Sequence, residues 1–313
     1  MANLRIIYMG TPEFAVPCLD RLIQEGHSVA AVVTQPDRPK GRGRKLAPSA
    51  VKEFALEQGL TVLQPEKIRE ADFVAQLEAL RPDMIVVVAF GQFLPRVLLD
   101  LPPLGCINVH ASLLPKYRGA APIHWAVMSG EKTTGVTTMF MDSGMDTGDM
   151  ILKVETSIGP DETSGQLHDR LKLLGADVLA QTLELAASGS LSRTPQDNTA
   201  ATYAPLLNRE TERIDWNNPA PIVHNLVRGL NPWPGAYCLH GDKNLKIWRT
   251  EFRSTSLPAQ TPGRVSAIGG DNVIVATANG TVELCEVQPE NRRRMAAGEY
   301  ARGYGLNVGE ILG

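Results

Sequence analysis

The first half of the chain alternates short apolar runs with amphipathic segments. Three runs rich in β-branched residues lie at 4–9, 28–34 and 84–90. Such runs are typical of strands that are buried on both faces, as in a parallel sheet. The segments between them have apolar residues at helical spacing, over 14–24, 51–58 and 71–82. This alternation predicts a doubly wound α/β domain.

The same pattern continues to about residue 187 and then stops. Further strands are expected at 106–110 and 135–142, and a long amphipathic helix over about 164–187. From 188 to 208 the apolar periodicity gives way to Ser, Thr, Pro and Asn, a composition typical of linkers. We therefore predict a first domain over 1–188, a linker over 189–208 and a second domain over 209–313.

The second domain contains short alternating segments separated by Gly and Pro turns, at 245–250, 272–277 and 281–288. These predict a small β-barrel or sandwich. Trp216, Trp233 and Trp248 could in principle stack on bases. Core packing is the favoured interpretation, and the turn NPWPG, which contains Trp233, is expected to bury its indole.

Composition narrows the class of protein. A chain of 313 residues is long enough for about two domains, and 43% hydrophobic and 21% charged residues are typical of globular proteins. The longest apolar run, 84–90, is too short to span a bilayer. Four scattered cysteines without a C-x-x-C pair, and no secretory signal, predict reduced thiols, no metal site and a cytoplasmic protein.

The net charge of −3 excludes a generally basic nucleic-acid binder, so any contact with a polyanion needs a local patch. Residues 35–46 provide one, with five Lys or Arg against Asp37 alone: Arg38, Lys40, Arg42, Arg44 and Lys45. This loop could contact nucleic-acid phosphates, or its charges could only aid solubility. A second basic run, 292–294, is interpreted as a solvated face.

Asn108 and His110 end a predicted strand and, being two residues apart, point to the same face. Ligands of open α/β sheets bind beyond the carboxyl ends of the strands. An amide and a protonated imidazole could both donate to a carbonyl oxygen that becomes negative during acyl transfer. The alternative is a structural pair without a catalytic role.

A carboxylate near this pair would stabilise the imidazolium and manage a proton. The segment 141–150, MDSGMDTGDM, follows another predicted strand. Asp146 lies between two glycines, where the backbone can approach a ligand closely. Asp142 and Asp149 remain alternatives on spacing alone.

Six segments, in order along the chain, resemble the methionyl-tRNA formyltransferase family: 9–22, 34–52, 87–95, 105–123, 141–150 and 231–236. The resemblance implies a Rossmann-like formyltransferase domain with a parallel-type sheet, followed by a small OB-like β-barrel domain. It also implies an enzyme that transfers the formyl group of 10-formyltetrahydrofolate to methionine carried by initiator tRNA.

The resemblance assigns the catalytic roles to Asn108, His110 and Asp146. The tetrahydrofolate site is expected at Ser112, Leu113, Leu114 and Pro115, with Gly91 and Gln92. It favours tRNA binding by Arg38, Lys40, Arg42, Arg44 and Lys45, and the chain is expected to be a monomer that needs no metal. One departure is His124, where the family pattern predicts Gln. Lys116 and Arg118 could contact a substrate anion or cap the turn, and this choice stays open.

Three alternative functions agree less well with the motifs of the sequence. A nicotinamide dehydrogenase is excluded because MGTPEF, and no G-x-G-x-x-G, follows the first strand. A formyltransferase acting on an amino sugar or nucleotide amine would share the catalytic motifs, whereas the basic loop and the C-terminal domain favour tRNA. A non-enzymatic RNA-binding protein would leave Asn108, His110 and Asp146 without a purpose.

Overall fold

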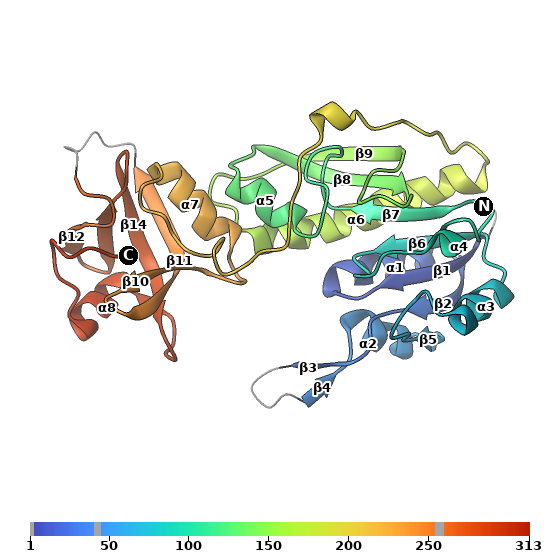
Figure 1. The fold of residues 1–313 in the computed structure, drawn as a ribbon, viewed down its shortest axis with the longest axis horizontal. Coiled ribbons are helices and arrows are strands. Elements are labelled where there is room, and N and C mark those ends of the chain that lie inside the picture. The colour runs from blue at the N-terminus through green and yellow to red at the C-terminus, as the bar shows by residue number, and fades with distance from the viewer. Residues whose placement is uncertain (1–2, 41–44, 254–259) are drawn as a thin grey trace. The chain divides into compact units, whose positions relative to one another are not determined.

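The computed structural model describes residues 3–40, 45–253 and 260–313 (Figure 1), and the chain divides into two compact units. The N-terminal unit consists of Met1–Gly119, Thr134–Thr156 and His168–Tyr203. The C-terminal unit consists of Ala120–Thr133, Ser157–Leu167 and Ala204–Gly313. Both units are therefore built from segments that are distant in sequence. The domain limits expected from the sequence, 1–188, 189–208 and 209–313, stay a prediction.

A seven-stranded sheet with the order β5-β2-β1-β6-β7-β8-β9 forms the centre of the N-terminal unit (Figure 1). Its strands are β1 (Arg5–Gly10), β2 (Ser28–Val33), β5 (Val62–Leu63), β6 (Met84–Val88), β7 (Cys106–His110), β8 (Thr133–Phe140) and β9 (Met150–Ser157). The pairs from β5 to β7 are parallel and β7 pairs with β8 in the antiparallel sense. The prediction of a mainly parallel, Rossmann-like sheet is confirmed.

Helices cover both faces of this sheet, and they are α1 (Val16–Gln24), α2 (Ala50–Glu57), α3 (Ala71–Ala79), α4 (Arg96–Leu99) and α6 (Ser164–Ala187). On one face, Leu77 of α3 and Leu98 of α4 join the core formed with Ile85 of β6. On the other, Gly175 of α6 approaches β7 so closely that an added Cβ would lie 3.3 Å from Val109. Burial on both faces is what the β-branched runs predict.

The C-terminal unit contains an antiparallel sheet with the order β10-β11-β14-β13-β12, and β15 pairs with β14. Its strands are β10 (Ala236–His240), β11 (Lys243–Arg253), β12 (Val265–Gly269), β13 (Asn272–Ala276), β14 (Thr281–Pro289) and β15 (Met295–Ala296). The last residues connect its two edges: Gly313 exchanges hydrogen bonds of 2.6 and 2.9 Å with Leu239 of β10, and the Val265 N–H of β12 donates to Glu310 at 2.8 Å. The prediction of a second, small β domain is confirmed, and its paired strands are antiparallel.

Three helices belong to the C-terminal unit: α5 (Pro122–Met128), α7 (Ala220–Gly229) and α8 (Ala297–Tyr304). Trp216 and Trp248 are buried as predicted, with 4% and 6% of their surface exposed. The expected burial of Trp233 is wrong, because its side chain is 67% exposed. The turn packs its backbone instead, since a Cβ on Gly235 would lie 2.5 Å from the Trp248 ring.

Within the described ranges, no helix has the length and apolar character that crossing a membrane requires.

Candidate active site

Asn108 and His110 are held at the end of β7, in the interior of the sheet. β7 lies between β6 and β8, with Asn108 opposite Val87 and His110 opposite Thr137. All five residues of β7 are buried, and Asn108 and His110 retain only 9% and 6% of their exposure. The two polar side chains therefore enter the site from a rigid strand that its neighbours pair on both sides.

Asp146 comes from the segment between β8 and β9 and meets this pair. Its Oδ1 lies 3.4 Å from Asn108 Nδ2, and its Oδ2 lies 3.7 Å from His110 Nδ1. The Gly119 backbone N–H donates to Oδ2 at 2.8 Å. The structure thus brings together the three side chains that the sequence placed in one site, although they come from segments 38 residues apart.

The second nitrogen of His110 also has a partner, because Nε2 lies 3.0 Å from the Tyr117 carbonyl oxygen. A carbonyl oxygen only accepts, so Nε2 carries the hydrogen of this bond. When Nδ1 is protonated as well, the ring donates to a carbonyl on one side and faces a carboxylate on the other. Each ring nitrogen of His110 therefore faces an oxygen atom.

The two alternative carboxylates are used elsewhere. Asp142 Oδ1 accepts hydrogen bonds from the Gly144 N–H at 2.9 Å and from Thr147 Oγ1 at 2.7 Å, which shapes the turn. Asp149 forms an ion pair of 3.6 Å with Arg193. Of the three carboxylates that spacing left open, Asp146 is the one that lies against Asn108 and His110.

The segment 112–115, expected to line the folate site, is fixed against β8. Thr137 Oγ1 donates to the Ser112 carbonyl at 2.7 Å and accepts from the Leu114 N–H at 3.2 Å. The Ser112 hydroxyl donates to the Lys116 carbonyl at 2.6 Å, and Leu114 is fully buried. Leu113 and Pro115, which are partly exposed, are therefore the side chains that a ligand can reach.

Gly91 and Gln92 follow β6, next to β7 in the sheet. Gly91 has a φ of 88° and is exposed, so its backbone is open to a ligand without a side chain in the way. The Gln92 side chain accepts a hydrogen bond of 3.1 Å from the Ile68 N–H. The parallel strands β6 and β7 both end at this edge, which is where open α/β sheets bind ligands.

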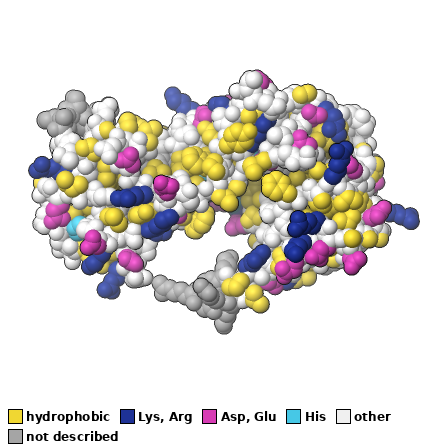
Figure 2. Space-filling model, in the orientation of Figure 1, with side chains coloured by type: hydrophobic (Ala, Val, Ile, Leu, Met, Phe, Trp, Pro, Cys, Tyr) yellow, Lys and Arg dark blue, Asp and Glu magenta, His cyan; other side chains and the backbone are white. Residues whose placement is uncertain are grey.

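Three of the predicted tRNA-binding residues, Arg38, Lys40 and Lys45, lie on a hairpin formed by β3 (Arg38–Lys40) and β4 (Lys45–Ala47). Arg38 is exposed. Arg42 and Arg44 lie outside the described residues, as do the side chains of Lys40 and Lys45. On the face shown in Figure 2, basic and acidic side chains are interspersed. The sequence of residues 35–46 differs from this mixture, because it has an excess of positive charge.

The base of this hairpin is anchored by polar side chains. Lys52 Nζ lies 2.8 Å from both carboxylate oxygens of Asp37, and Gln64 Nε2 donates to Asp37 Oδ1 at 2.8 Å. The residues that precede and follow this segment are also joined, because the hydroxyls of Thr34 and Ser49 are 2.7 Å apart. Hydrogen bonds from Lys52 and then from Gln64 lower the pKa of Asp37 below its ordinary value.

Sequence reasoning missed a network behind Asp146. Arg118 is 2% exposed, and its Nη2 donates to Gln196 Oε1 and to Asn198 Oδ1, each at 2.8 Å. Gln196 Nε2 in turn donates to the carbonyls of Asp146 and Gly148, each at 2.8 Å. Arg118 thus contacts side chains of the protein, a role that neither expected alternative, binding a substrate anion or capping the turn, included. No local pattern could have revealed Gln196, which lies in the predicted linker.

Two other features belong to the C-terminal unit. His124 lies on α5, where Nδ1 is 2.8 Å from the Gly229 carbonyl oxygen.

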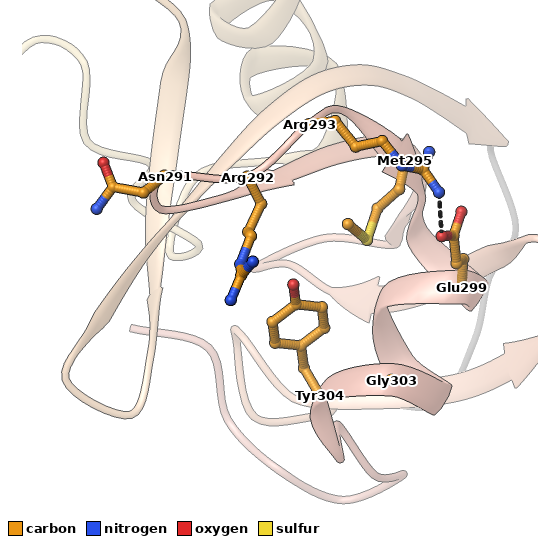
Figure 3. A pocket seen from close by; sticks show the side chains of 7 residues that line it. All are labelled: Asn291, Arg292, Arg293, Met295, Glu299, Gly303 and Tyr304. Atoms are coloured by element: carbon orange, nitrogen blue, oxygen red, sulfur yellow. Dashed lines mark hydrogen bonds and ion pairs between the residues drawn. The ribbon is translucent and has the colours of Figure 1, made fainter.

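A pocket of about 510 Å³ is lined by the residues drawn in Figure 3. Arg292 and Tyr304 point into it, and Arg293 pairs with Glu299 at 2.6 Å. It contains none of the residues predicted for catalysis, folate or tRNA.

In the part of the chain that the structure describes, no group of three or more His, Cys, Asp or Glu side chains is placed to hold a metal ion.

Two solved structures share the fold. A sugar 3N-formyl transferase, WlaRD, in the presence of dTDP and 5-N-formyl-THF, has a TM-score of 0.69 and 18% identity, covering 94% of this chain and 100% of that one. HypX from Aquifex aeolicus in complex with tetrahydrofolic acid has a TM-score of 0.66 and 17% identity, covering 98% of this chain and 48% of that one. The chain therefore spans about half the length of HypX. These identities support a common fold alone.

Family models match both units. The formyl transferase model matches residues 3–183 and the model of the formyl transferase C-terminal domain matches residues 206–305, which places the chain among the formyl transferases. A methionyl-tRNA formyltransferase of Acetivibrio thermocellus is 51% identical over 310 residues, covering 99% of this chain and 100% of the relative. The chain belongs to the methionyl-tRNA formyltransferase family.

The anchor of the hairpin predicts a pH effect. The pKa of Asp37 in the folded protein is lower than the ordinary value of an Asp carboxyl, because its hydrogen bonds favour the charged form. These bonds stabilise the hairpin base fully at pH values above that ordinary pKa. The stabilisation is lost as the pH falls through the lowered pKa. Lys52→Met should raise the pKa of Asp37 toward the ordinary value, as followed by NMR titration of the carboxyl carbon. Asp169, whose pKa is lowered by Lys172 and His168, is the control and should not move. An unchanged Asp37 pKa would contradict the assignment.

Proposed function

We propose that this chain transfers the formyl group of 10-formyltetrahydrofolate to the amino group of methionine on initiator tRNA, giving N-formylmethionyl-tRNA for translation initiation. The observation that carries the proposal is the meeting of Asn108, His110 and Asp146 at the end of β7, in a chain of this family. We further propose that it acts as a cytoplasmic monomer.

The reaction needs a stabilised oxyanion. The neutral methionyl amine attacks the formyl carbon, a C–N bond forms, and the formyl oxygen becomes negative. Asn108 Nδ2 and an N–H of protonated His110 donate to this oxygen, and each such donor typically lowers the barrier by about 2.7–4 kcal/mol. The Tyr117 carbonyl keeps the Nε2–H of His110 oriented before the substrate arrives.

One proton must also be moved, from the amine to N10 of tetrahydrofolate. Asp146, whose carboxylate lies beside Asn108 and His110, accepts the proton that the amine loses. The C=O bond then re-forms as the bond from the formyl carbon to N10 breaks, and N10 leaves with the proton that Asp146 took from the amine. Asp146 also stabilises the imidazolium form of His110. No step needs a metal ion.

The folate substrate is assigned to the edge formed by the ends of β6 and β7. The exposed backbone of Gly91 and the backbone of the half-buried Gln92 contact the pterin, and the side chains of Leu113 and Pro115 line the site. Ser112 and Leu114 hold the segment in place rather than contact the folate, because their backbone groups bond to Thr137 of β8 and the Ser112 hydroxyl bonds to Lys116.

The tRNA substrate is assigned to the basic hairpin and to a C-terminal domain over 209–313, joined to the catalytic domain (1–188) through 189–208. Arg38, Lys40, Arg42, Arg44 and Lys45 supply positive charge for phosphates of the acceptor end. The anchored base of the hairpin fixes the backbone next to Arg38, so less conformational entropy is lost when Arg38 binds a phosphate.

Mass analysis of the reaction product tests this function directly. The protein is incubated with 10-formyltetrahydrofolate and with charged initiator tRNA, charged elongator tRNA, or an amino sugar nucleotide. We expect formyl-methionine to be released from the initiator tRNA alone. Formylation of the sugar amine instead would favour the alternative acceptor, and tRNA binding without any formyl transfer would favour a non-enzymatic RNA-binding protein.

Exchange of two neighbouring carboxylates separates catalysis from local structure. Asp146→Asn should lower the single-turnover rate by at least about 100-fold, since a general base typically contributes 10²–10⁴. Asp149→Asn is the matched control, because the Asp149 carboxylate pairs with Arg193, and should stay within a few-fold of the parent. A few-fold effect of Asp146→Asn would refute its role.

The salt dependence of tRNA binding tests the hairpin. Replacing Arg42, Arg44 and Lys45 together by Gln should flatten the slope of log K against log salt, since each phosphate contact contributes roughly 0.7 to 0.9. Arg96→Gln, on an Arg that is 87% exposed and pairs with Asp100, serves as the control. An unchanged slope in the triple variant would exclude the hairpin from the interface.

A further inference from the structure

Asp146 has an unfavourable backbone conformation. Its φ is +53°, in the left-handed region, where a residue with a Cβ is disfavoured. The neighbouring Gly148 is tightly enclosed, since a Cβ there would lie 1.8 Å from the Phe140 carbonyl oxygen. A conformation of this kind persists only when the surroundings hold it in place, so the contacts of this segment determine where the carboxylate points.

Gln196 supplies such contacts from a distant segment. Its Nε2 donates to the carbonyl of Asp146 itself and to that of Gly148, each at 2.8 Å, and thereby fixes the backbone that directly follows the left-handed residue. Residues 194–203 are anchored at both ends. Thr194 exchanges two hydrogen bonds of 2.9 Å with Met150, and the Arg118 N–H donates to the Thr202 carbonyl at 2.9 Å. Residues 194–203, which lie within the expected linker, are therefore held at a fixed place next to Asp146.

Arg118 determines which way the Gln196 amide faces. A guanidinium can only donate, so Oε1 of Gln196 must face it, at 3.1 Å from Nε and 2.8 Å from Nη2. The amide NH₂ is then left to face the two carbonyls. Arg118 is 2% exposed, and its guanidinium donates to neutral amide oxygens of Gln196 and Asn198.

We propose that Gln196, oriented by Arg118, is a positioning residue that sets the carboxylate of Asp146 against Asn108 and His110. The proposal rests on the proposed function, because the reaction is what makes the position of the carboxylate matter. Gln196 touches neither substrate nor the reacting atoms and acts through the backbone of Asp146.

A double-mutant cycle tests this dependence. Gln196→Met keeps the length of the side chain and removes its donors, and should lower kcat by up to about 100-fold, as misplacing a catalytic group by 1 Å can. The KM values for both substrates should stay nearly constant. In an Asp146→Asn background the same substitution should change the rate by no more than about twofold, because its effect passes through that carboxylate. Asp197→Asn, at an exposed neighbour, is the control.

Two results would overturn the proposal: a Gln196→Met rate within about twofold of the parent, or an equal loss in the parent and Asp146→Asn backgrounds. Hydrogen exchange of the amides at 144–150 gives a second reading that needs no activity, and it should be faster in Gln196→Met and unchanged in Asp197→Asn. If the parent does not formylate methionyl-tRNA, the proposed function fails, while unaltered exchange in Gln196→Met would still refute the positioning contact.

Discussion

The site depends on one constraint: a carboxylate on a strained, non-glycine residue must face two donors on a rigid strand. Asn108 and His110 cannot move much, because β7 is paired on both sides and buried. Asp146 lies on a turn and needs external support, which the Gly119 N–H gives to its carboxylate and Gln196 gives to its backbone. The sheet therefore fixes the positions of Asn108 and His110, and a long-range polar network fixes the position of Asp146.

Much of the fold follows from the sequence, because burial of both strand faces leaves a clear signature. Runs such as 84–90 contain no charged position, and only a sheet covered by helices on both faces has a place for such strands. Two elements of the site also follow from local geometry. The side-chain period of a strand puts Asn108 and His110 on one face, and glycines on both sides of Asp146 indicate a turn that can approach another segment closely.

The remaining features depend on partners that no local pattern identifies. Gln196 meets Asp146 across 50 residues and Arg118 across 78, and a polar, Pro-containing stretch has the same composition whether it is a free linker or a strut. Trp233 was misplaced for a related reason. A turn can pack either its side chain or its backbone on a core, and at Gly235 the backbone approaches Trp248. Spacing likewise could not separate Asp146 from Asp142, whose carboxylate closes its own turn.

The central claim is that the three side chains surround one carbon atom. A crystal structure with a stable 10-formyl folate analogue, and without an acceptor amine, measures this most directly. The account predicts that the formyl oxygen lies within hydrogen-bonding distance of Asn108 Nδ2 and a ring nitrogen of His110, about 2.7–3.2 Å, with the Asp146 carboxylate beside the open face of the formyl carbon. A bound analogue whose formyl group is remote from all three side chains would contradict it.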